Sequence, residues 1–269
     1  MKEKEMSTSS KILVGLCLLV IVGIAVYYLI KGVPYLLQTP VNRLTVQETG
    51  LLLPEDFDTG LPHADRISCG NYDKEEVISY FDEVVLASEF AGSKPILKWT
   101  VPVLYHISGT PTEEDRATLE KLIARINQIP GFPGMTETQN LDESNFRIHF
   151  YEDDEYAAFS KKYGFANTDG FAFCWNGKGS ILQTIIGFRL GTTQSRRNSV
   201  ILEETIQGIG LLADSFRYPD SVVYEGVKEL TQPKDLDWIL VRALYSPAVF
   251  HEQECGICNA ILRYYLLQP

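Results

Sequence analysis

The 269-residue sequence lacks most of the short motifs that identify an enzyme. It contains no G-x-S-x-G turn, no G-x-x-x-x-G-K-[ST] phosphate loop, and no G-x-G-x-x-G segment after a predicted strand. Histidine is scarce: the four are His63, His106, His149 and His251, and no two are spaced to ligate a metal from one helix. Nucleotide binding and serine-hydrolase chemistry therefore have no support in the sequence.

Basic residues are also few. The chain has 24 Lys and Arg against 35 Asp and Glu, a formal net charge of −11. The first 31 residues hold four Lys and two Glu, so 20 basic and 33 acidic residues remain, which gives the rest of the chain a charge of −13. An anionic surface repels nucleic acid and acidic lipid, so we expect no nucleic-acid partner.

Only one long hydrophobic run is present, from Ile12 to Ile30, with nineteen residues and no charge. At ~1.5 Å of rise per residue, this length suits a helix that spans the bilayer. Secretory signal peptides have shorter apolar cores, of about 7–15 residues, followed by a small-residue cleavage site. Here the run ends in Tyr27-Tyr28 and Lys31, which favours a retained transmembrane helix at residues 12–30.

The flanking charges predict the orientation of this helix. Lys2, Lys4 and Lys11 precede it, whereas Lys31 and the distant Arg43 follow, so residues 1–11 are expected in the cytoplasm. Four prolines between residues 31 and 66 indicate an extracytoplasmic stalk. Residues 67–269 then form one domain outside the cytoplasm, and the protein is predicted to be a single-pass protein of the cell membrane whose membrane contact is this one helix.

The cysteines leave several alternatives open. Cys17 lies inside the predicted span, and Cys69, Cys174, Cys255 and Cys258 belong to the domain. Four cysteines allow three disulfide pairings, which the sequence does not distinguish. The Cys255-x-x-Cys258 spacing also occurs in redox pairs, but no strand-to-helix context precedes it, so a structural disulfide or unpaired buried thiols are the expected alternatives.

Hydrophobic periodicity predicts the order helix, strand, helix, three strands and three helices. This segregated order indicates a mixed α+β domain rather than a repeating βαβ sheet. The predicted elements are helices at residues 73–91, 112–129, 198–212, 233–244 and 255–267, strands at 97–107 (with Pro102 near an edge or bulge) and 146–151, and two short strands at about 171–175 and 181–189 that flank an Asn176-Gly177 turn.

Residues 203–214, with the sequence EETIQGIGLLAD, carry the functional argument. Their spacing resembles the H-E-x-x-H-x-x-G-x-x-H motif of metzincin zinc peptidases. In this resemblance Glu204 matches the general base and Gly210 the glycine at which the chain turns. The segments at 98–100, 218–224 and 230–245 are similar to the first strand, the turn beneath the metal and the closing helix of the matrixin branch.

The three positions of the zinc ligands are, however, occupied by Glu203, Gln207 and Ala213. A methyl group coordinates nothing, and a neutral amide is a poor donor to zinc, whereas a catalytic zinc site needs three protein ligands. We therefore predict no metal site and no cofactor, zinc included.

A closer resemblance is to a family of uncharacterised bacterial envelope proteins, a domain of unknown function with the core E-E-x-x-Q-x-x-G-L followed by an Asp and a Pro-Asp-Ser turn. The resemblance implies a zincin-like (metzincin-type) fold, with a mixed β-sheet, a central "active-site" helix and a replaced ligand set. It also implies structural roles for Gly210, Pro219 and Ser221. The pattern is matched at Glu203, Glu204, Gln207, Gly210, Leu211, Asp214, Pro219, Asp220 and Ser221.

Three interpretations of the replaced site remain open. Glu203 and Gln207 lie at i and i+4 on one side of a helix, and Glu204 is turned by about 100° from Glu203. These residues could stabilise the fold through hydrogen bonds, with Arg196 or Arg197 neutralising the acids. Alternatively, the cleft could bind a protein or peptide ligand by strand addition, which needs no metal.

The third interpretation is residual catalysis. A hard cation could bind to oxygens of Glu203, Gln207 and Asp214, or Glu203 and Glu204 could act as a metal-free carboxylate pair. Adjacent helix residues point too far apart to share one water, which disfavours the pair. The hypothesis from the sequence is a membrane-anchored extracytoplasmic zincin-like domain without zinc ligands that acts as a non-catalytic binding or assembly module. The alternative is a cryptic peptidase or hydrolase with Glu204 as general base.

Overall fold

A computed structural model of the chain describes residues 66–86, 96–164, 168–251, 253 and 255–269. The chain divides into two units, residues 1–54 and 55–269, and the described residues all belong to the second. The predicted transmembrane helix at residues 12–30 lies outside the described residues, as does the predicted stalk up to residue 65. Within the part that is described, no helix combines the length and the apolar composition needed to cross a membrane.

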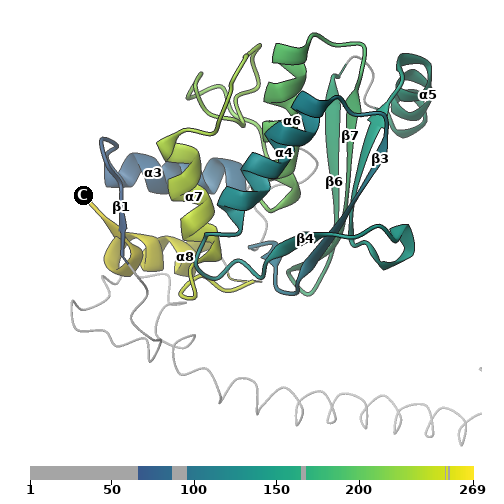
Figure 1. Ribbon diagram of the computed structural model, residues 1–269. Helices are drawn as coiled ribbons and strands as arrows, with labels where there is room; N and C mark the ends of the chain where they lie inside the picture. Colours follow the sequence, from purple (N-terminus) through teal and green to yellow (C-terminus); the bar gives the residue numbers. More distant parts are fainter. Residues whose placement is uncertain (1–65, 87–95, 165–167, 252, 254) are drawn as a thin grey trace, which may run out of the picture. The chain divides into compact units, whose positions relative to one another are not determined.

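A mixed sheet of six strands is the centre of the domain (Figure 1). Its strands are β2 (Lys98–Trp99), β3 (Val103–Gly109), β4 (Met135–Glu137), β5 (Phe146–Tyr151), β6 (Gly170–Gly177) and β7 (Ser180–Arg189). The order is β2-β7-β5-β3-β4, and β6 pairs with β7. The pairings are parallel except for β6, which runs antiparallel to β7.

Two helices, α4 (Glu113–Ile126) and α6 (Gln194–Gly208), cover one face of this sheet (Figure 1). The shorter α5 (Asp153–Tyr163) packs against the other face, where Phe159 stacks on Phe171 of β6 with 4.8 Å between ring centroids. Beside the sheet lies a helical group formed by α3 (Lys74–Phe81), the π-helical η1 (Asp82–Leu86), α7 (Asp235–Tyr245), α8 (Cys255–Ile261) and η3 (Leu262–Leu266). A parallel pair of short strands, β1 (Ile67–Ser68) and β8 (Leu267–Gln268), joins the two ends of the domain.

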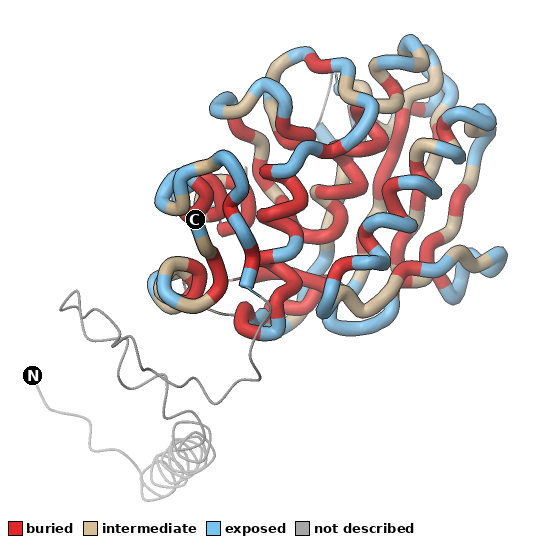
Figure 2. The backbone as a smooth tube through the Cα atoms, turned by 60° about the vertical axis from the view of Figure 1, so that its left-hand side comes forward, coloured by how far each residue is buried: buried red, intermediate tan, exposed pale blue. Residues whose placement is uncertain are grey.

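The alternation of buried and partly exposed side chains along the strands determines which face of the sheet α6 covers. Phe146, Ile148 and Phe150 of β5 are buried, and the ring of Phe146 lies against Gly208 at the end of α6. The intervening residues of β5 point to the opposite face, because neighbouring side chains of a strand alternate. Figure 2 shows the resulting band of buried backbone through the strands and the helices beside them.

A buried ion pair connects the N-terminal ends of α4 and α6. Arg197 Nε donates to Asp115 Oδ1 at 2.8 Å, and both side chains are almost fully buried. Asp115 also belongs to the capping box of α4, in which it accepts from the backbone N–H of Thr112 at 2.9 Å. Because a buried carboxylate needs such partners, this pair fixes how the two helices meet.

Most of the predicted elements are present, with shifted ends. The helix predicted at 112–129 is α4, with Thr112 as its N-cap, and the strand predicted at 146–151 is β5. The strand predicted at 97–107 is interrupted between Trp99 and Val103, where Pro102 removes a backbone donor. The helix predicted at 198–212 is α6, which begins and ends four residues earlier because Thr193 caps its N-terminus and Gly210 turns the chain.

The predicted hairpin is correct, but its turn is not at Asn176-Gly177. Those two residues belong to β6 and pair with Ile181 and Ser180 of β7. The turn residues are Lys178 and Gly179, whose φ angles of 50° and 71° give the left-handed conformation of a two-residue hairpin.

Helix α5 and strand β4 were not predicted. The helix has an acidic first turn, two lysines in its last turn and Gly164 in the left-handed conformation after it, all of which are end signals. Its apolar residues are too few for a clear periodicity, and β4 is too short for one.

The cysteines of the domain are free thiols. Burial raises the pKa of Cys258 to about 12 and the pKa of Cys174 to about 11, so both remain protonated at neutral pH. Burial also raises the pKa of Cys255, so neither thiol of the Cys255-x-x-Cys258 segment at the start of α8 has the lowered pKa of a thioredoxin-like nucleophile.

Candidate functional site

The candidate site lies on the C-terminal half of α6 and on the turn that follows it, which together contain the predicted motif, and residues 199–206 of the helix are all buried. Its buried residues include two carboxylates, Glu203 and Glu204. Burying ionised groups is unfavourable unless each has a charged or hydrogen-bonding partner. The partners of these residues therefore indicate what the site does.

Glu203 forms an ion pair with Lys228. Lys228 Nζ lies 2.8 Å from Glu203 Oε1, and the lysine also donates to the backbone carbonyl of Tyr224. The two side chains are 2% and 11% exposed for Lys228 and Glu203 respectively. Burial raises the pKa of Glu203, and the positive charge of Lys228 opposes this shift.

The partner of Glu203 differs from the one that the sequence suggested. Neither Arg196 nor Arg197 pairs with it: Arg196 Nε donates to Asp169 at 2.9 Å, and Arg197 belongs to the pair with Asp115. The more distant positive charge of Arg196 lowers the pKa of Glu203, but the two side chains form no ion pair. Lys228 was missed because it lies in an irregular segment between α6 and α7 that gives no periodic signal.

The residues at the second and third ligand positions of the motif, Gln207 and Ala213, also contact other residues of the chain. Gln207 Nε2 donates to Asp214 Oδ1 at 2.7 Å, so these two predicted site residues are neighbours across the turn that ends α6. Ala213 is buried, and its backbone N–H donates to the carbonyl oxygen of Val84 at 3.2 Å. The structure thus brings Gln207 and Asp214 together, and it places Glu203 in a separate pair with Lys228.

Glu204 faces another part of the molecule. Its Oε1 lies 2.9 Å from the point where a Cβ on Gly170 would be, so it packs over the first residue of β6, and the side chain is mostly buried. Glu203 and Glu204 are therefore directed to different partners, Lys228 on one side and β6 on the other. This arrangement matches the expected rotation between neighbouring helix residues and keeps the two carboxylates from acting on one water.

Gly210 holds the turn that the motif requires. Its φ is +123°, a conformation that residues with a side chain rarely adopt. A Cβ there would lie 2.7 Å from the carbonyl oxygen of Leu97 and 2.8 Å from a methyl of Leu244. The close approach lets the chain after α6 pass between the start of β2 and α7.

The segment at Pro219 and Ser221 forms a turn that is tied to α7. Pro219 is exposed, whereas Ser221 is buried and donates to Asp237 Oδ1 at 2.6 Å. Tyr80 of α3 donates its hydroxyl to Ser221 Oγ at 3.0 Å. Burial raises the pKa of Asp237 to about 6. Ser221 therefore links its own turn to α3 and to α7 by hydrogen bonds.

The residues present do not fit a zinc ion. One ligand position holds a buried methyl group, one an amide bonded to Asp214, and one a carboxylate paired with a lysine. Across the described part of the chain, no three His, Cys, Asp or Glu side chains are grouped so as to hold a metal ion.

The histidines that the structure describes lie away from α6. His106 Nδ1 is 3.0 Å from the carbonyl oxygen of Thr138, and His149 Nδ1 is 2.6 Å from Ser108 Oγ. Both alternate along their strands with residues that face α6, so they occupy the opposite side of the sheet. His251 is exposed, and His63 lies outside the described residues.

These features define a mixed α/β domain with a largely parallel sheet and a central buried helix whose polar residues pair within the chain. The family described as "Protein of unknown function (DUF2927)" matches residues 74–251, which is more than half of the chain. The chain belongs to this family. A comparison with curated proteins gave no match.

Substitution of Gly210 by alanine tests the role of the turn. We expect Gly210→Ala to lower the free energy of unfolding by about 3 kcal/mol, because it adds backbone strain and overpacking. Chemical denaturation followed by circular dichroism measures the change. Gly256→Ala is the matched control, since a Cβ at Gly256 meets nothing within 4 Å. Equal stabilities of the two variants would contradict the role assigned to Gly210.

Proposed function

We propose that the protein is a membrane-anchored, extracytoplasmic binding or assembly module of the cell envelope, with a zincin-like domain that has lost its zinc ligands. The observation that carries this proposal is the pairing on α6: Glu203 with Lys228, and Gln207 with Asp214. Groups that satisfy one another inside the chain do not coordinate a catalytic ion. The predicted membrane helix at residues 12–30 supplies the anchor.

The arrangement around α6 supports the zincin-like part of the proposal. The helix lies under a sheet whose antiparallel strand, β6, is next to it, and Cys174 Sγ of β6 is 3.8 Å from the carbonyl oxygen of Gly208. The motif residues Glu203, Glu204 and Gln207 lie near the end of this helix, and the turn at Gly210 comes directly after it. In zincin-type proteins, peptide binds as an added strand beside the sheet edge.

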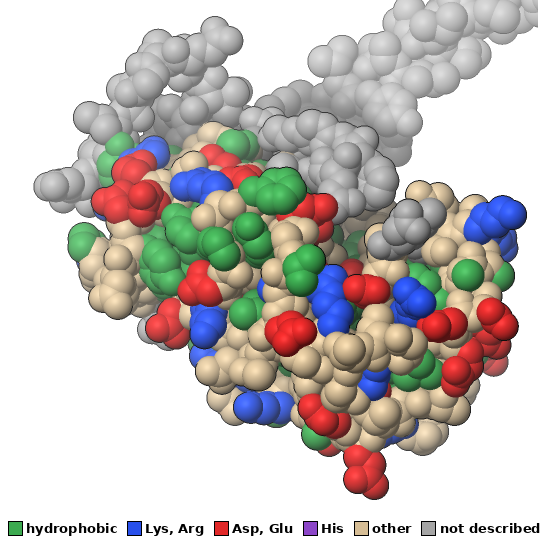
Figure 3. Space-filling model, turned by 90° about the horizontal axis from the view of Figure 1, so that it is seen from above, with side chains coloured by type: hydrophobic (Ala, Val, Ile, Leu, Met, Phe, Trp, Pro, Cys, Tyr) green, Lys and Arg blue, Asp and Glu red, His purple; other side chains and the backbone are tan. Residues whose placement is uncertain are grey.

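The surface charge agrees with a protein or peptide ligand rather than a nucleic acid. On the face shown in Figure 3, acidic and basic side chains are interspersed and form no basic field. The net charge of −13 after residue 31 would repel a phosphate backbone. Strand addition uses main-chain hydrogen bonds, and side-chain pockets or aromatic surfaces beside the strand supply selectivity.

Trp175 is the residue of β6 best placed to contact such a ligand. It is 49% exposed, and its ring lies 6.1 Å from that of Phe173 on the same strand. Half-exposed tryptophans beside an edge strand offer a large apolar area with a polar N–H. We therefore propose that a peptide adds along β6 and contacts Trp175.

The peptide-binding proposal predicts a selective loss in Trp175→Ala. Binding of the full-length chain to an array of extended peptides should weaken by about tenfold, the scale of an interface residue that contributes 1–2 kcal/mol. Phe216→Ala is the control, because Phe216 is 73% exposed and lies outside the sheet. Peptide binding that is absent in the wild type, or unaffected by Trp175→Ala, would contradict binding along β6.

The alternative is a cryptic hydrolase with Glu204 as general base, and a separate experiment distinguishes it. We expect purified full-length protein to contain no stoichiometric zinc and to show the same background peptidase rate as Glu204→Gln. Metal analysis and a peptidase assay provide the two measurements, with Glu120→Gln on the exposed side of α4 as the control. Stoichiometric zinc, or activity that Glu204→Gln alone removes, would establish the alternative.

A further inference from the structure

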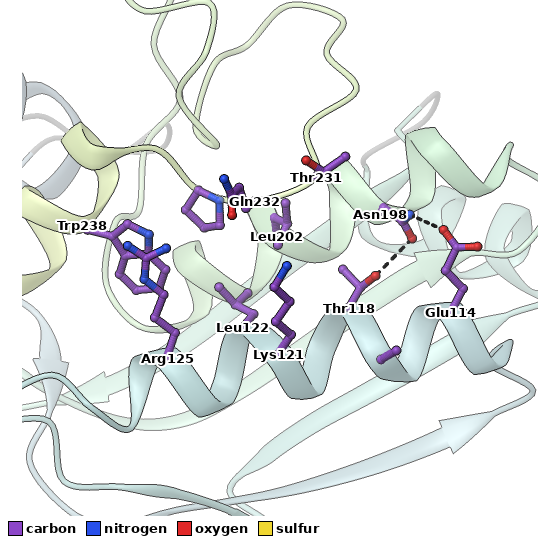
Figure 4. A pocket seen from close by; sticks show the side chains of 12 residues that line it. Glu114, Thr118, Lys121, Leu122, Arg125, Asn198, Leu202, Thr231, Gln232 and Trp238 are labelled. Atoms are coloured by element: carbon purple, nitrogen blue, oxygen red, sulfur yellow. Dashed lines mark hydrogen bonds between the residues drawn. The ribbon is translucent and has the colours of Figure 1, made fainter.

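A pocket of about 290 Å³ lies between α4, α6 and residues 231–233, and Asn198 and Leu202 line it from α6 (Figure 4). Its apolar part is formed by Leu122, Leu202 and Pro233. Side chains of Lys121 and Arg125 rise from α4 beside it, and Trp238 of α7 closes one end. None of these residues belongs to the predicted motif, and the pocket combines an apolar surface with two cations.

The two cations have no acidic partner within the described residues. Lys121 and Arg125 stand at i and i+4 on α4, where like charges repel each other, and neither forms an ion pair with a described carboxylate. The chain has more acidic than basic residues, 35 against 24, so two neighbouring cations on one face of a helix differ from its overall negative charge. The acidic residue that lines this pocket, Glu114, accepts from Asn198 Nδ2 at 2.8 Å instead.

Trp238 supplies an independent observation that points to a ligand. The residue is only 5% exposed, and its indole Nε1 is buried with no acceptor within the described part of the chain. An unpaired buried donor destabilises a protein by about 1–3 kcal/mol. The Arg125 guanidinium lies 4.2 Å from the indole ring, so a movement of this exposed side chain would uncover the tryptophan.

A second hollow adjoins the first. It has a volume of about 460 Å³, and Arg125 and Trp238 line both. Arg242 adds a further cation there, and Asp235 adds a carboxylate. The Arg125–Trp238 contact therefore forms the wall between two hollows, which gives a ligand room to reach the indole when the arginine moves.

We propose that the first pocket binds a small ligand with one oxyanion, a carboxylate or a phosphate, joined to an apolar body. The oxyanion lies between Lys121 and Arg125, whose charges it neutralises. The apolar body packs on Leu122, Leu202 and Pro233. Arg125 leaves the indole face to meet the anion, and Trp238 Nε1 donates to a ligand oxygen. The volume is near the lower limit of ligand pockets, about 300 Å³, which favours a body the size of one aromatic side chain.

Nuclear magnetic resonance of the indole N–H groups tests this proposal directly. The chain has three tryptophans, and Trp238→Phe assigns the signal of Trp238 in the ¹⁵N-labelled full-length protein. We expect phenylacetate or phenyl phosphate to shift this signal saturably and to leave those of Trp99 and Trp175 unchanged. The tighter of the two probes identifies which oxyanion the pocket prefers.

Matched variants and probes decide the outcome. Lys121→Gln, at an exposed position, should weaken binding of the preferred probe by about tenfold through loss of one charge-assisted bond, and Lys161→Gln on α5 should not. The neutral phenylacetamide should cause no saturable shift. The proposal is overturned if no probe saturates the Trp238 signal, if Lys121→Gln binds as well as wild type, or if inorganic phosphate alone produces the response.

Discussion

The charged side chains that α6 carries into the interior need partners inside the chain, and the arrangement of the elements around this helix depends on those partners. Helix α6 carries Arg197 and Glu203 into the interior, and each is paired with a residue from another segment, Asp115 and Lys228. A buried charge without its partner would destabilise the fold by several kcal/mol. The pairs therefore determine where α4 and the segment before α7 lie relative to α6.

The same constraint separates this site from that of a metallopeptidase. In the proposed interpretation, an ammonium–carboxylate pair and an amide–carboxylate bond connect α6 to the segments that follow it, where a zinc ion would otherwise hold them together. Glu204, which matches the general base of the resemblance, lies against β6 and faces away from the partner of Glu203. The polar residues Glu203 and Gln207 of this helix are paired with Lys228 and Asp214 of the segments that follow it.

Local signals predicted much of the fold. Thr112, followed by three acidic residues, placed the start of α4, and strict alternation placed β5. The turn at Gly210, whose φ is +123°, was expected from the resemblance alone, and the predicted helix ran past it to residue 212. The hairpin turn was displaced by two residues because β6 and β7 continue pairing through Asn176 and Gly177. Elements with few apolar residues, such as α5, gave too weak a periodicity to be recognised.

The partners of the site residues could not be predicted in the same way. A lysine at position 228, in a segment without regular structure, has no sequence pattern that directs it to Glu203. The pocket was missed for a similar reason, because its residues come from α4, α6 and α7, and Lys121 and Arg125 resemble ordinary solvent-facing residues of a helix. Such contacts form only when segments that are distant in the sequence pack together, so no local sequence pattern predicts them.

A double-mutant cycle on Glu203 and Lys228 tests the central claim most directly. The free energy of unfolding is measured for Glu203→Gln, Lys228→Met and the double variant. The account predicts a loss of about 3–5 kcal/mol when either partner alone is removed, and a double variant that is more stable than the sum of the single losses by at least about 2 kcal/mol. Losses that add to within about 0.5 kcal/mol would show that the two residues do not form the buried pair, and would contradict the account.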